Sequence, residues 1–145
     1  MRVDEMKTVM FVCTGNTCRS PMAQYLFQQM AGGRAVSASA GLTARDGSPA
    51  SACAQEAMRE IGIDISAHRS RLLTPDLIHG ADAVVAMGKE HYYMLLHCGA
   101  PKERLYLLGS GIEDPYGGSL VVYRQCRNKI EEALKALLPE VMGDA

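Results

Sequence analysis

The chain has 145 residues, of which 48% are hydrophobic, and a formal net charge of −1. This length is typical of one folded domain with one core, so we expect residues 1–145 to form a single domain. A nearly neutral charge argues against nucleic acid as the main partner, because binding a phosphate backbone requires a strongly basic surface.

The early apolar run at residues 9–13 is far too short for a signal peptide or a membrane span. The five cysteines are an odd number, and none has the spacing of a metal-binding pair. We therefore expect a cytoplasmic protein with reduced thiols, no membrane partner, and no metal or other cofactor.

Strand and helix patterns alternate along the chain. Strands are predicted at 9–12, 35–40, 83–87 and 105–108, and helices at about 21–30, 49–61, 90–97 and 119–138, with a short helix that begins at Thr74-Pro75. Prolines set several boundaries: Pro21 and Pro49 suit first helical positions, Thr74-Pro75 opens a short helix, and Pro139 is expected to end the last one. The alternation predicts an α/β fold, a parallel sheet with helices on both faces, and a ligand at the carboxyl ends of the strands.

Between the first strand and the first helix lies the sequence Cys-Thr-Gly-Asn-Thr-Cys-Arg-Ser, residues 13–20. The N–H groups of the loop from Thr14 to Cys18, and those of the helix N-terminus, would point into one cavity and bind phosphate or another tetrahedral oxyanion. The same positive field favours the thiolate form of Cys13, which is the nucleophilic form.

Each remaining residue of this loop suits a part of that chemistry. Gly15 permits a tight turn and a close approach of the anion, and Asn16 tolerates a left-handed backbone and can brace the loop. Arg19 presents a planar fork that holds two phosphate oxygens into the transition state. Ser20 either donates a hydrogen bond to the Cys13 thiolate or caps the helix.

A cysteine followed six positions later by an arginine occurs three times in the chain. Residues 53–59 have helical spacing, so their N–H groups are already used. Residues 98–104 include Pro101, which has no N–H, and Glu103, which would repel a phosphate. The alternative for Cys13, a small buried core residue, explains none of its surroundings.

Asp114-Pro115-Tyr116 lies in the loop between the fourth strand and the last helix, where it would reach the same edge of the sheet. Hydrolysis of a phosphate ester needs an acid for the leaving oxygen and then a base for the attacking water, and Asp114 suits both. Pro115 stiffens the loop, and Tyr116 is a candidate wall of the substrate pocket. The alternative is a turn that only starts the helix.

Residues 13–20 together with 114–116 closely resemble the low-molecular-weight protein tyrosine phosphatases. The resemblance spans nearly the whole chain and includes weaker matches at 39–41, 68–71 and 86–87. It implies a four-stranded parallel sheet, a phosphorylated protein as substrate, a phosphocysteine intermediate on Cys13, Asp114 as acid and then base, and no metal. One departure is Gly88, where many members carry an aspartate beside the site.

Thr17 leaves the substrate side chain open between phosphotyrosine and phosphoarginine. Tyrosine phosphatases of the family usually carry an aliphatic residue at this position. A threonine there, with Gly-Gly-Ser after the aromatic residue, resembles the bacterial protein arginine phosphatases of the same superfamily. A hydroxyl accepts a hydrogen bond from a guanidinium, which an aliphatic side chain would desolvate without pairing.

Two other functions remain as alternatives. An arsenate reductase uses a similar oxyanion loop but needs further cysteines, usually a nearby pair, whereas Cys53, Cys98 and Cys126 are widely separated. A non-catalytic phosphate-binding module would need neither a nucleophile nor an acid. Cys18 shares the loop with Cys13, so it is also a candidate redox partner that forms a disulfide after oxidation, or else a packing residue.

Overall fold

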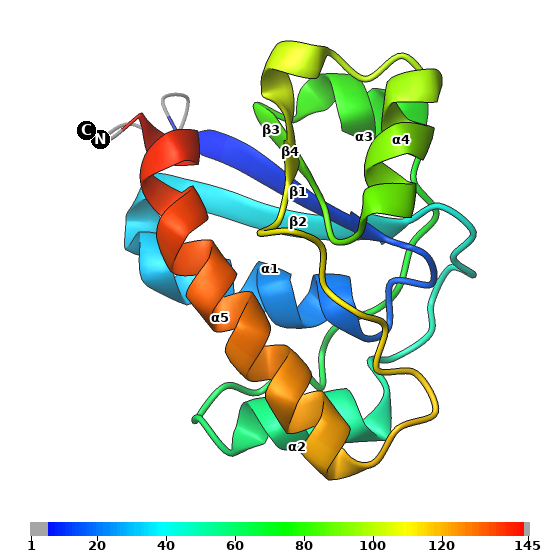
Figure 1. Ribbon diagram of the computed structural model, residues 1–145, viewed down its shortest axis with the longest axis vertical. Coiled ribbons are helices and arrows are strands. Elements are labelled where there is room, and N and C mark those ends of the chain that lie inside the picture. The colour runs from blue at the N-terminus through cyan, green and yellow to red at the C-terminus, as the bar shows by residue number, and fades with distance from the viewer. Residues whose placement is uncertain (1–5, 144–145) are drawn as a thin grey trace.

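A parallel sheet of four strands in the order β2-β1-β3-β4 forms the centre of the fold (Figure 1). The computed structural model describes residues 6–143. The strands are β1 (Lys7–Cys13), β2 (Ala35–Gly41), β3 (Ala83–Ala86) and β4 (Leu105–Leu107). The predicted α/β class, the parallel sheet and all four strands are confirmed, to within two residues at each end.

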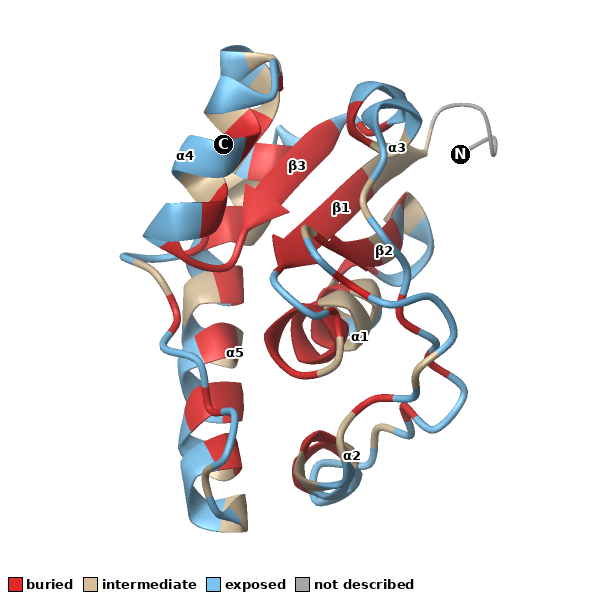
Figure 2. Cartoon of the chain, turned by 90° about the vertical axis from the view of Figure 1, so that its right-hand side faces the viewer, coloured by how far each residue is buried: buried red, intermediate tan, exposed pale blue. Residues whose placement is uncertain are grey.

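Helices cover both faces of the sheet, so the predicted three layers are also confirmed (Figures 1 and 2). The helices are α1 (Arg19–Ala31), α2 (Ala52–Arg59), α3 (Pro75–Gly80), α4 (Lys89–His97) and α5 (Leu120–Met142), with one-turn 3₁₀ helices η2 (Gly32–Arg34) and η3 (Lys102–Arg104). One face carries α1 and α5, the other carries α3 and α4, and α2 packs on α1 and α5 away from the sheet.

Alternate residues of β1 build the two cores. Val9 and Phe11 pack with α1 and α5, whereas Met10 and Val12 pack with α3 and α4. All four are at most 2% exposed, because a strand between two helical layers has no face left for water (Figure 2). Truncating Phe11 to alanine would cost about 3–5 kcal/mol of stability.

The first helix begins earlier than Pro21. It starts at Arg19, so Pro21 is its third residue. The first four N–H groups of a helix have no partner inside the helix, so a proline at the third position costs no hydrogen bond. As a result, Arg19 and Ser20 belong to the first turn of α1 and are held by the helix backbone.

The second helix begins later than expected, at Ala52 instead of Pro49. Ser51 is its N-cap, with Oγ accepting from the Ala54 N–H at 3.3 Å. The Ser51 N–H donates to the Thr17 carbonyl at 2.9 Å. The segment before α2 therefore runs alongside the loop after β1, and Ser51 caps α2 at the point where the chain turns away from that loop.

The last helix does not end at Pro139 but continues to Met142. Proline removes one hydrogen bond to the preceding turn, but the added turn is held by tertiary contacts. Val141 is 3% exposed, and Lys7 Nζ donates to its carbonyl at 3.0 Å. Gly143, with φ of 75°, then ends the helix.

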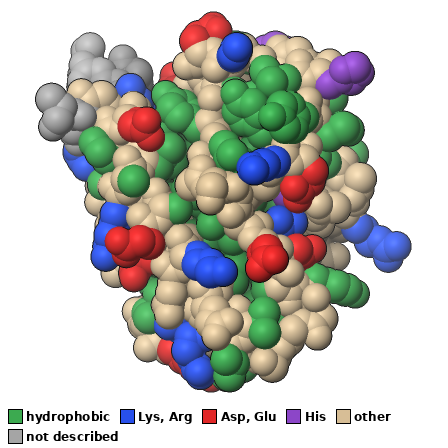
Figure 3. All heavy atoms as spheres, viewed as in Figure 1, with side chains coloured by type: hydrophobic (Ala, Val, Ile, Leu, Met, Phe, Trp, Pro, Cys, Tyr) green, Lys and Arg blue, Asp and Glu red, His purple; other side chains and the backbone are tan. Residues whose placement is uncertain are grey.

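The central strands β1 and β3 are neighbours, and their following connections lead to opposite sides of the sheet. A crevice opens at the carboxyl ends of two such strands, which is where parallel sheets bind ligands. Acidic and basic side chains mix over the described part of the face in Figure 3, without a continuous basic stripe. Within residues 6–143, no helix has both the length and the apolar character needed to cross a membrane.

Candidate active site

The loop between β1 and α1 curls around the sulfur of Cys13. Among residues 6–143, Asn16 is the one non-glycine residue with positive φ, 59°, the left-handed conformation for which asparagine is suited. This turn directs the Asn16 N–H to Cys13 Sγ at 3.3 Å. The backbone of the loop therefore already supplies a donor to the sulfur.

The Asn16 side chain, which is fully buried, braces the loop from behind. Its Nδ2 donates to Ser20 Oγ at 2.8 Å and to Ser39 Oγ at 2.9 Å, and its Oδ1 accepts from the Arg71 N–H at 3.0 Å. The Asn16 carbonyl accepts from His68 Nε2 at 2.8 Å. Segments 39–41 and 68–71, which resemble the family weakly in sequence, thus support the loop directly.

Gly41 is required by a close approach of this loop. A Cβ at Gly41 would lie 2.5 Å from the Thr14 carbonyl oxygen, a distance that no real Cβ maintains. The Leu42 N–H donates to the Cys13 carbonyl at 2.9 Å and the Thr43 N–H to the Thr14 carbonyl at 3.0 Å. The end of β2 therefore fixes the point where the loop leaves β1.

Ser20 faces the sulfur of Cys13, with Oγ and Sγ 2.8 Å apart. Because Ser20 Oγ already accepts from Asn16 Nδ2, its own hydrogen is free to donate to the sulfur. Ser20 is the second residue of α1, so of the two roles considered for it, it does not cap the helix.

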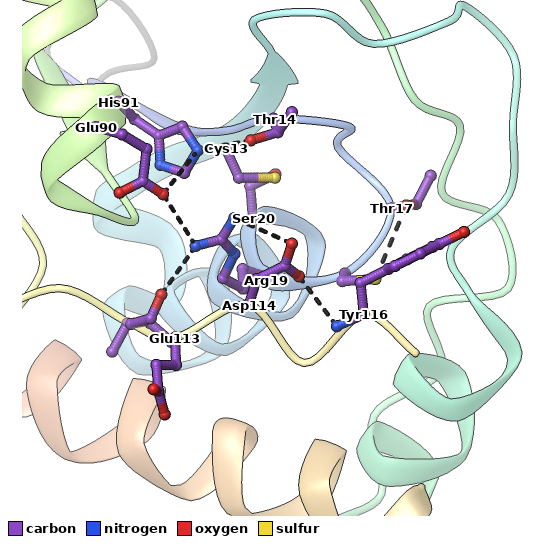
Figure 4. Close-up of polar contacts among 12 residues, drawn as sticks. Cys13, Thr14, Thr17, Arg19, Ser20, Glu90, His91, Glu113, Asp114 and Tyr116 are labelled. Atoms are coloured by element: carbon purple, nitrogen blue, oxygen red, sulfur yellow. Dashed lines mark hydrogen bonds and ion pairs between the residues drawn. The ribbon is translucent and has the colours of Figure 1, made fainter. Parts of the chain in front are cut away.

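Arg19 is 4% exposed and lies beside two carboxylates (Figure 4). Its Nη1 donates to the Ile112 carbonyl at 2.9 Å and lies 3.6 Å from Glu90 Oε1. Its Nη2 lies 3.8 Å from Asp114 Oδ2. The guanidinium is therefore held at one edge by backbone and stands between two acids.

Asp114 and Tyr116 lie in the loop before α5, as the sequence predicts. Asp114 Oδ1 accepts from the Tyr116 N–H at 3.1 Å, while the side chain stays half exposed beside Arg19. Ser119 occupies the N-cap position of α5, so starting the helix is not the role of Asp114. Tyr116 is 82% exposed and borders the same hollow.

A cavity of about 240 Å³ brings these residues together. It is lined by Cys13, Thr14, Gly15, Asn16, Thr17, Cys18, Arg19, Asp114 and Tyr116. Every predicted site residue except Ser20 lines it, and Ser20 lies behind the Cys13 sulfur. The Cys13 side chain, the residues of the loop, Arg19 and Asp114 therefore line one space, and together they offer the types of group needed to transfer a phosphoryl group.

Sequence reasoning did not identify Glu90, which fills the space left by Gly88. A Cβ at Gly88 would lie 2.6 Å from Glu90 Oε1. A hydrogen bond with its own N–H lowers the pKa of Glu90, and His91 and Arg19 lower it further. The carboxylate missing at position 88 is thus supplied two residues later, from the first turn of α4. No local sequence signal identifies Glu90, because its approach to the loop depends on which strands of the sheet are neighbours.

Two other side chains near the loop have shifted pKa values. Burial lowers the pKa of His68, and the charges of Arg69 and Arg71 add to the effect. Burial and a hydrogen bond to Cys18 raise the pKa of Tyr123 to about 12. Both side chains are therefore neutral at physiological pH.

The thiol of Cys18 contacts helices α2 and α5. Its Sγ lies 3.2 Å from the Tyr123 hydroxyl and 3.5 Å from Ser51 Oγ. The proposed disulfide with Cys13 thus requires Cys18 to leave both partners. Within the described residues, no three histidine, cysteine or acidic side chains gather as metal ligands do.

Comparison with known proteins gives consistent matches over nearly the whole chain. The family model for "low molecular weight phosphotyrosine protein phosphatase" matches residues 8–145. A protein-arginine-phosphatase of Bacillus subtilis and a probable low molecular weight protein-tyrosine-phosphatase, EpsP, of Ralstonia nicotianae are each 37% identical, over 94% of this chain and 97% of the relative. Arsenate reductase 2 of Staphylococcus epidermidis is 33% identical over 91% of this chain and 96% of its own.

Solved structures give the same result. The YwlE arginine phosphatase from Geobacillus stearothermophilus superposes with a TM-score of 0.88 at 35% identity, covering 95% of this chain and 94% of that one. Vibrio vulnificus Wzb in complex with benzylphosphonate superposes with a TM-score of 0.85 at 29% identity, covering 93% of this chain and 99% of that one.

Proposed function

The chain belongs to the low molecular weight phosphotyrosine protein phosphatase family, and from this premise we propose that it removes the phosphoryl group from phosphoarginine in proteins, with Cys13 as nucleophile. The family phosphatases named above act on phosphotyrosine or phosphoarginine. The observation that favours arginine is Thr17, whose hydroxyl-bearing side chain borders the cavity that also contains Asp114.

In the first step, the Cys13 thiolate attacks phosphorus, and the bond from phosphorus to the substrate nitrogen or oxygen breaks. Loop N–H groups and the Arg19 fork hold the phosphoryl oxygens as their charge redistributes. Asp114, in its protonated form, gives its proton to the leaving atom. Arginine or tyrosine is released, and phosphate remains bonded to sulfur.

In the second step, Asp114, now ionised, accepts a proton from water, and the resulting hydroxide attacks phosphorus. The bond from sulfur to phosphorus breaks, inorganic phosphate leaves, and the thiolate returns. Ser20 supports this step, because its hydroxyl 2.8 Å from the sulfur stabilises the departing thiolate. All atoms and charges are accounted for without a metal or cofactor.

Charge and hydrogen bonding at the cavity mouth favour a guanidinium. The Asp114 carboxyl group, protonated in the first step, can still accept a hydrogen bond from a guanidinium nitrogen through its carbonyl oxygen, and Glu90 places a negative charge beside Arg19. The Thr17 hydroxyl, whose Oγ1 lies 3.8 Å from Cys18 Sγ, can also accept a hydrogen bond from a guanidinium nitrogen, which a phenyl ring cannot donate.

Phosphotyrosine is the second candidate. Tyr116, 82% exposed at the cavity, offers a flat surface against which a phenyl ring can pack. The EpsP relative, as identical as the arginine phosphatase, is named a probable tyrosine phosphatase.

One assay tests both candidates: hydrolysis of two peptides of the same sequence, phosphorylated on arginine in one and on tyrosine in the other, with a metal chelator present and Cys13→Ser as the blank. We expect a higher kcat/KM for phosphoarginine and, in a separate assay without the chelator, inhibition by orthovanadate, an oxyanion that would occupy the loop. A higher kcat/KM for phosphotyrosine would select the second candidate, and turnover of neither peptide would refute a phosphoprotein phosphatase.

Arsenate reduction is disfavoured by the placement of the remaining thiols. Cys126 is buried, and burial raises the pKa of its thiol to about 12, so it is a poor nucleophile. Cys98 is exposed beyond the end of α4, and Cys53 is half-buried on α2. Thiol-dependent production of arsenite would reverse this conclusion. The mechanism requires a reduced Cys13, in keeping with the reducing cytoplasm expected from the sequence.

A further inference from the structure

His91 is a buried histidine in contact with the phosphate-binding loop. It lies in the first turn of α4, and its side chain is 1% exposed. Its Nε2 lies 2.9 Å from Thr14 Oγ1 (Figure 4). Within residues 6–143, Nδ1 has no hydrogen-bond partner. The loop hydroxyl is therefore the one hydrogen-bond partner of the ring in the described chain.

The imidazole of His91 is neutral at physiological pH. Burial lowers its pKa, and the charge of Arg19 lowers it further. Glu90, with Oε1 3.6 Å from Nε2, and Asp114 act in the opposite direction but with smaller effect. The ring therefore carries one proton, on either Nε2 or Nδ1.

The contacts of the two nitrogens decide where that proton is. A proton on Nδ1 would leave a buried N–H without an acceptor, which is among the rarest defects of folded proteins. A proton on Nε2 donates to Thr14 Oγ1 and leaves Nδ1 as an unpaired acceptor, which is better tolerated. Nε2–H is therefore the favoured tautomer.

This tautomer determines what the Thr14 hydroxyl can do. When Oγ1 accepts from His91, the hydroxyl hydrogen is left for another acceptor. Thr14 is exposed and lines the cavity beside Cys13 and Arg19. A phosphoryl group bound in the cavity would offer its oxygens to this hydrogen as acceptors. In the opposite tautomer the hydroxyl would instead donate to the imidazole and have no hydrogen for the substrate.

We propose that His91 is a positioning residue, which donates from Nε2 to Thr14 Oγ1 and thereby turns the Thr14 hydroxyl hydrogen toward the phosphoryl group. This inference rests on the proposed phosphatase function and adds a side-chain donor to the N–H groups of the loop. The donor acts on charge that develops in the transition state, so it contributes mainly to kcat.

The test compares His91→Leu, which removes the donor, with His91→Gln, whose amide nitrogen replaces Nε2. We expect His91→Leu to lower kcat roughly tenfold, the effect of one hydrogen bond, with little change in KM. His91→Gln should retain most of the activity. His97→Leu, on the exposed end of the same helix, is the matched control and should behave as the wild type. Equal losses in the two His91 variants would overturn the proposal.

A double-mutant cycle with Thr14→Val separates positioning from packing. Because His91 acts through the Thr14 hydroxyl, His91→Leu should cause no further loss in the Thr14→Val background. The same tenfold loss in both backgrounds would refute the proposed route through Thr14.

A third measurement needs neither turnover nor a variant. Nitrogen NMR of the ring in the wild-type protein at neutral pH should show the proton on Nε2, and a proton on Nδ1 or on both nitrogens would overturn the proposal even if His91→Leu fails to fold. If the wild type hydrolyses neither phosphopeptide, the proposed function fails, whereas the ring measurement still decides the tautomer.

Discussion

Cys13 Sγ and Ser20 Oγ lie 2.8 Å apart, one at the end of β1 and the other in the first turn of α1. Asn16 Nδ2 donates to the same Ser20 oxygen, so the serine hydrogen points to the sulfur. Within residues 6–143, both polar contacts of the sulfur are thus with a donor, Ser20 or the Asn16 N–H. These contacts stabilise a thiolate, but none of them is a base that could remove a proton from a hydroxyl.

The first prediction concerns the nucleophile. Cys13→Ser should abolish turnover, because no base lies next to the new hydroxyl, while binding of inorganic phosphate should persist. Arg19→Lys should also be severe, since an ammonium cannot replace a bidentate fork. Steady-state assays and calorimetric titration with phosphate measure the two effects. Substantial activity of Cys13→Ser would contradict the covalent mechanism.

The second prediction concerns acid catalysis. Asp114→Ala should slow hydrolysis of aryl phosphates with poor leaving groups by roughly 10²–10⁴-fold, the usual contribution of a general acid. Phenolates that leave easily need no proton, so the variant should lose far less activity with them. A series of substituted phenyl phosphates measures the dependence. Asp114→Asn, which keeps the size of the side chain but has no acidic proton, is the matched variant. Equal losses across the series would assign Asp114 a structural role.

The third prediction concerns substrate choice at Thr17. Thr17→Ile should shift the ratio of kcat/KM for phosphoarginine over phosphotyrosine toward tyrosine, because a branched alkyl group desolvates a guanidinium without pairing it. Thr17→Ser, which keeps the hydroxyl, should preserve the ratio of the wild type. The two peptides of the assay above measure it. If Thr17→Ile leaves the ratio unchanged, Thr17 does not select the substrate.

The parts of the site that are contiguous in sequence were predictable. The loop from Cys13 to Arg19 directly follows an apolar strand and precedes a helical pattern, so its oxyanion-binding role can be predicted from neighbouring residues alone. The ends of helices were harder to predict, because local rules for proline ignore tertiary contacts. Pro139 lies inside α5 because the buried Val141 and its bond to Lys7 hold the next turn.

Glu90 and His91 were not predictable, because their approach to the loop depends on the order of the strands. β3 lies beside β1, with Val12 paired to Ala86, so the helix after β3 starts next to the loop after β1. No local pattern shows which two strands of a parallel sheet are neighbours. A glutamate and a histidine in a first helical turn are otherwise typical of a solvated helix end.

The fourth prediction concerns the ion pairs that join α2 to α5. Glu60 Oε1 and Oε2 accept from Arg124 at 2.9 and 2.6 Å, and Oε1 accepts from Arg127 Nη1 at 2.8 Å. Hydrogen bonds from Arg124 and then Arg127 lower the pKa of Glu60 from 4.5 to about 2. The folded state thus favours the ionised form, so the pairs stabilise the fold fully above pH 4.5, and this stabilisation is lost as pH falls toward 2.

We therefore expect Glu60→Gln to lower the urea midpoint at pH 7, with a difference from the wild type that shrinks below pH 4.5. Partial exposure of the pairs and screening by salt limit the effect, so added salt should reduce it. The matched control is Glu56→Gln, which breaks only the exposed pair with Arg59 inside α2. A difference for Glu60→Gln that does not vary with pH would point to packing instead of charge.

The last prediction concerns oxidation and Cys18. Peroxide converts the Cys13 thiolate to a sulfenic acid, and attack by the Cys18 thiol would release water and form a disulfide, which a dithiol then reduces. The wild type should therefore be inactivated by peroxide and recover activity with dithiothreitol, whereas Cys18→Ser should be inactivated and recover poorly.

Before it can react, Cys18 must leave the Tyr123 hydroxyl, 3.2 Å from its sulfur. Tyr123→Phe removes that partner and should speed disulfide formation. Mass spectrometry of the peptide that contains both cysteines measures the rate. Equal recovery of the wild type and Cys18→Ser would reduce Cys18 to a packing residue between the loop and α5.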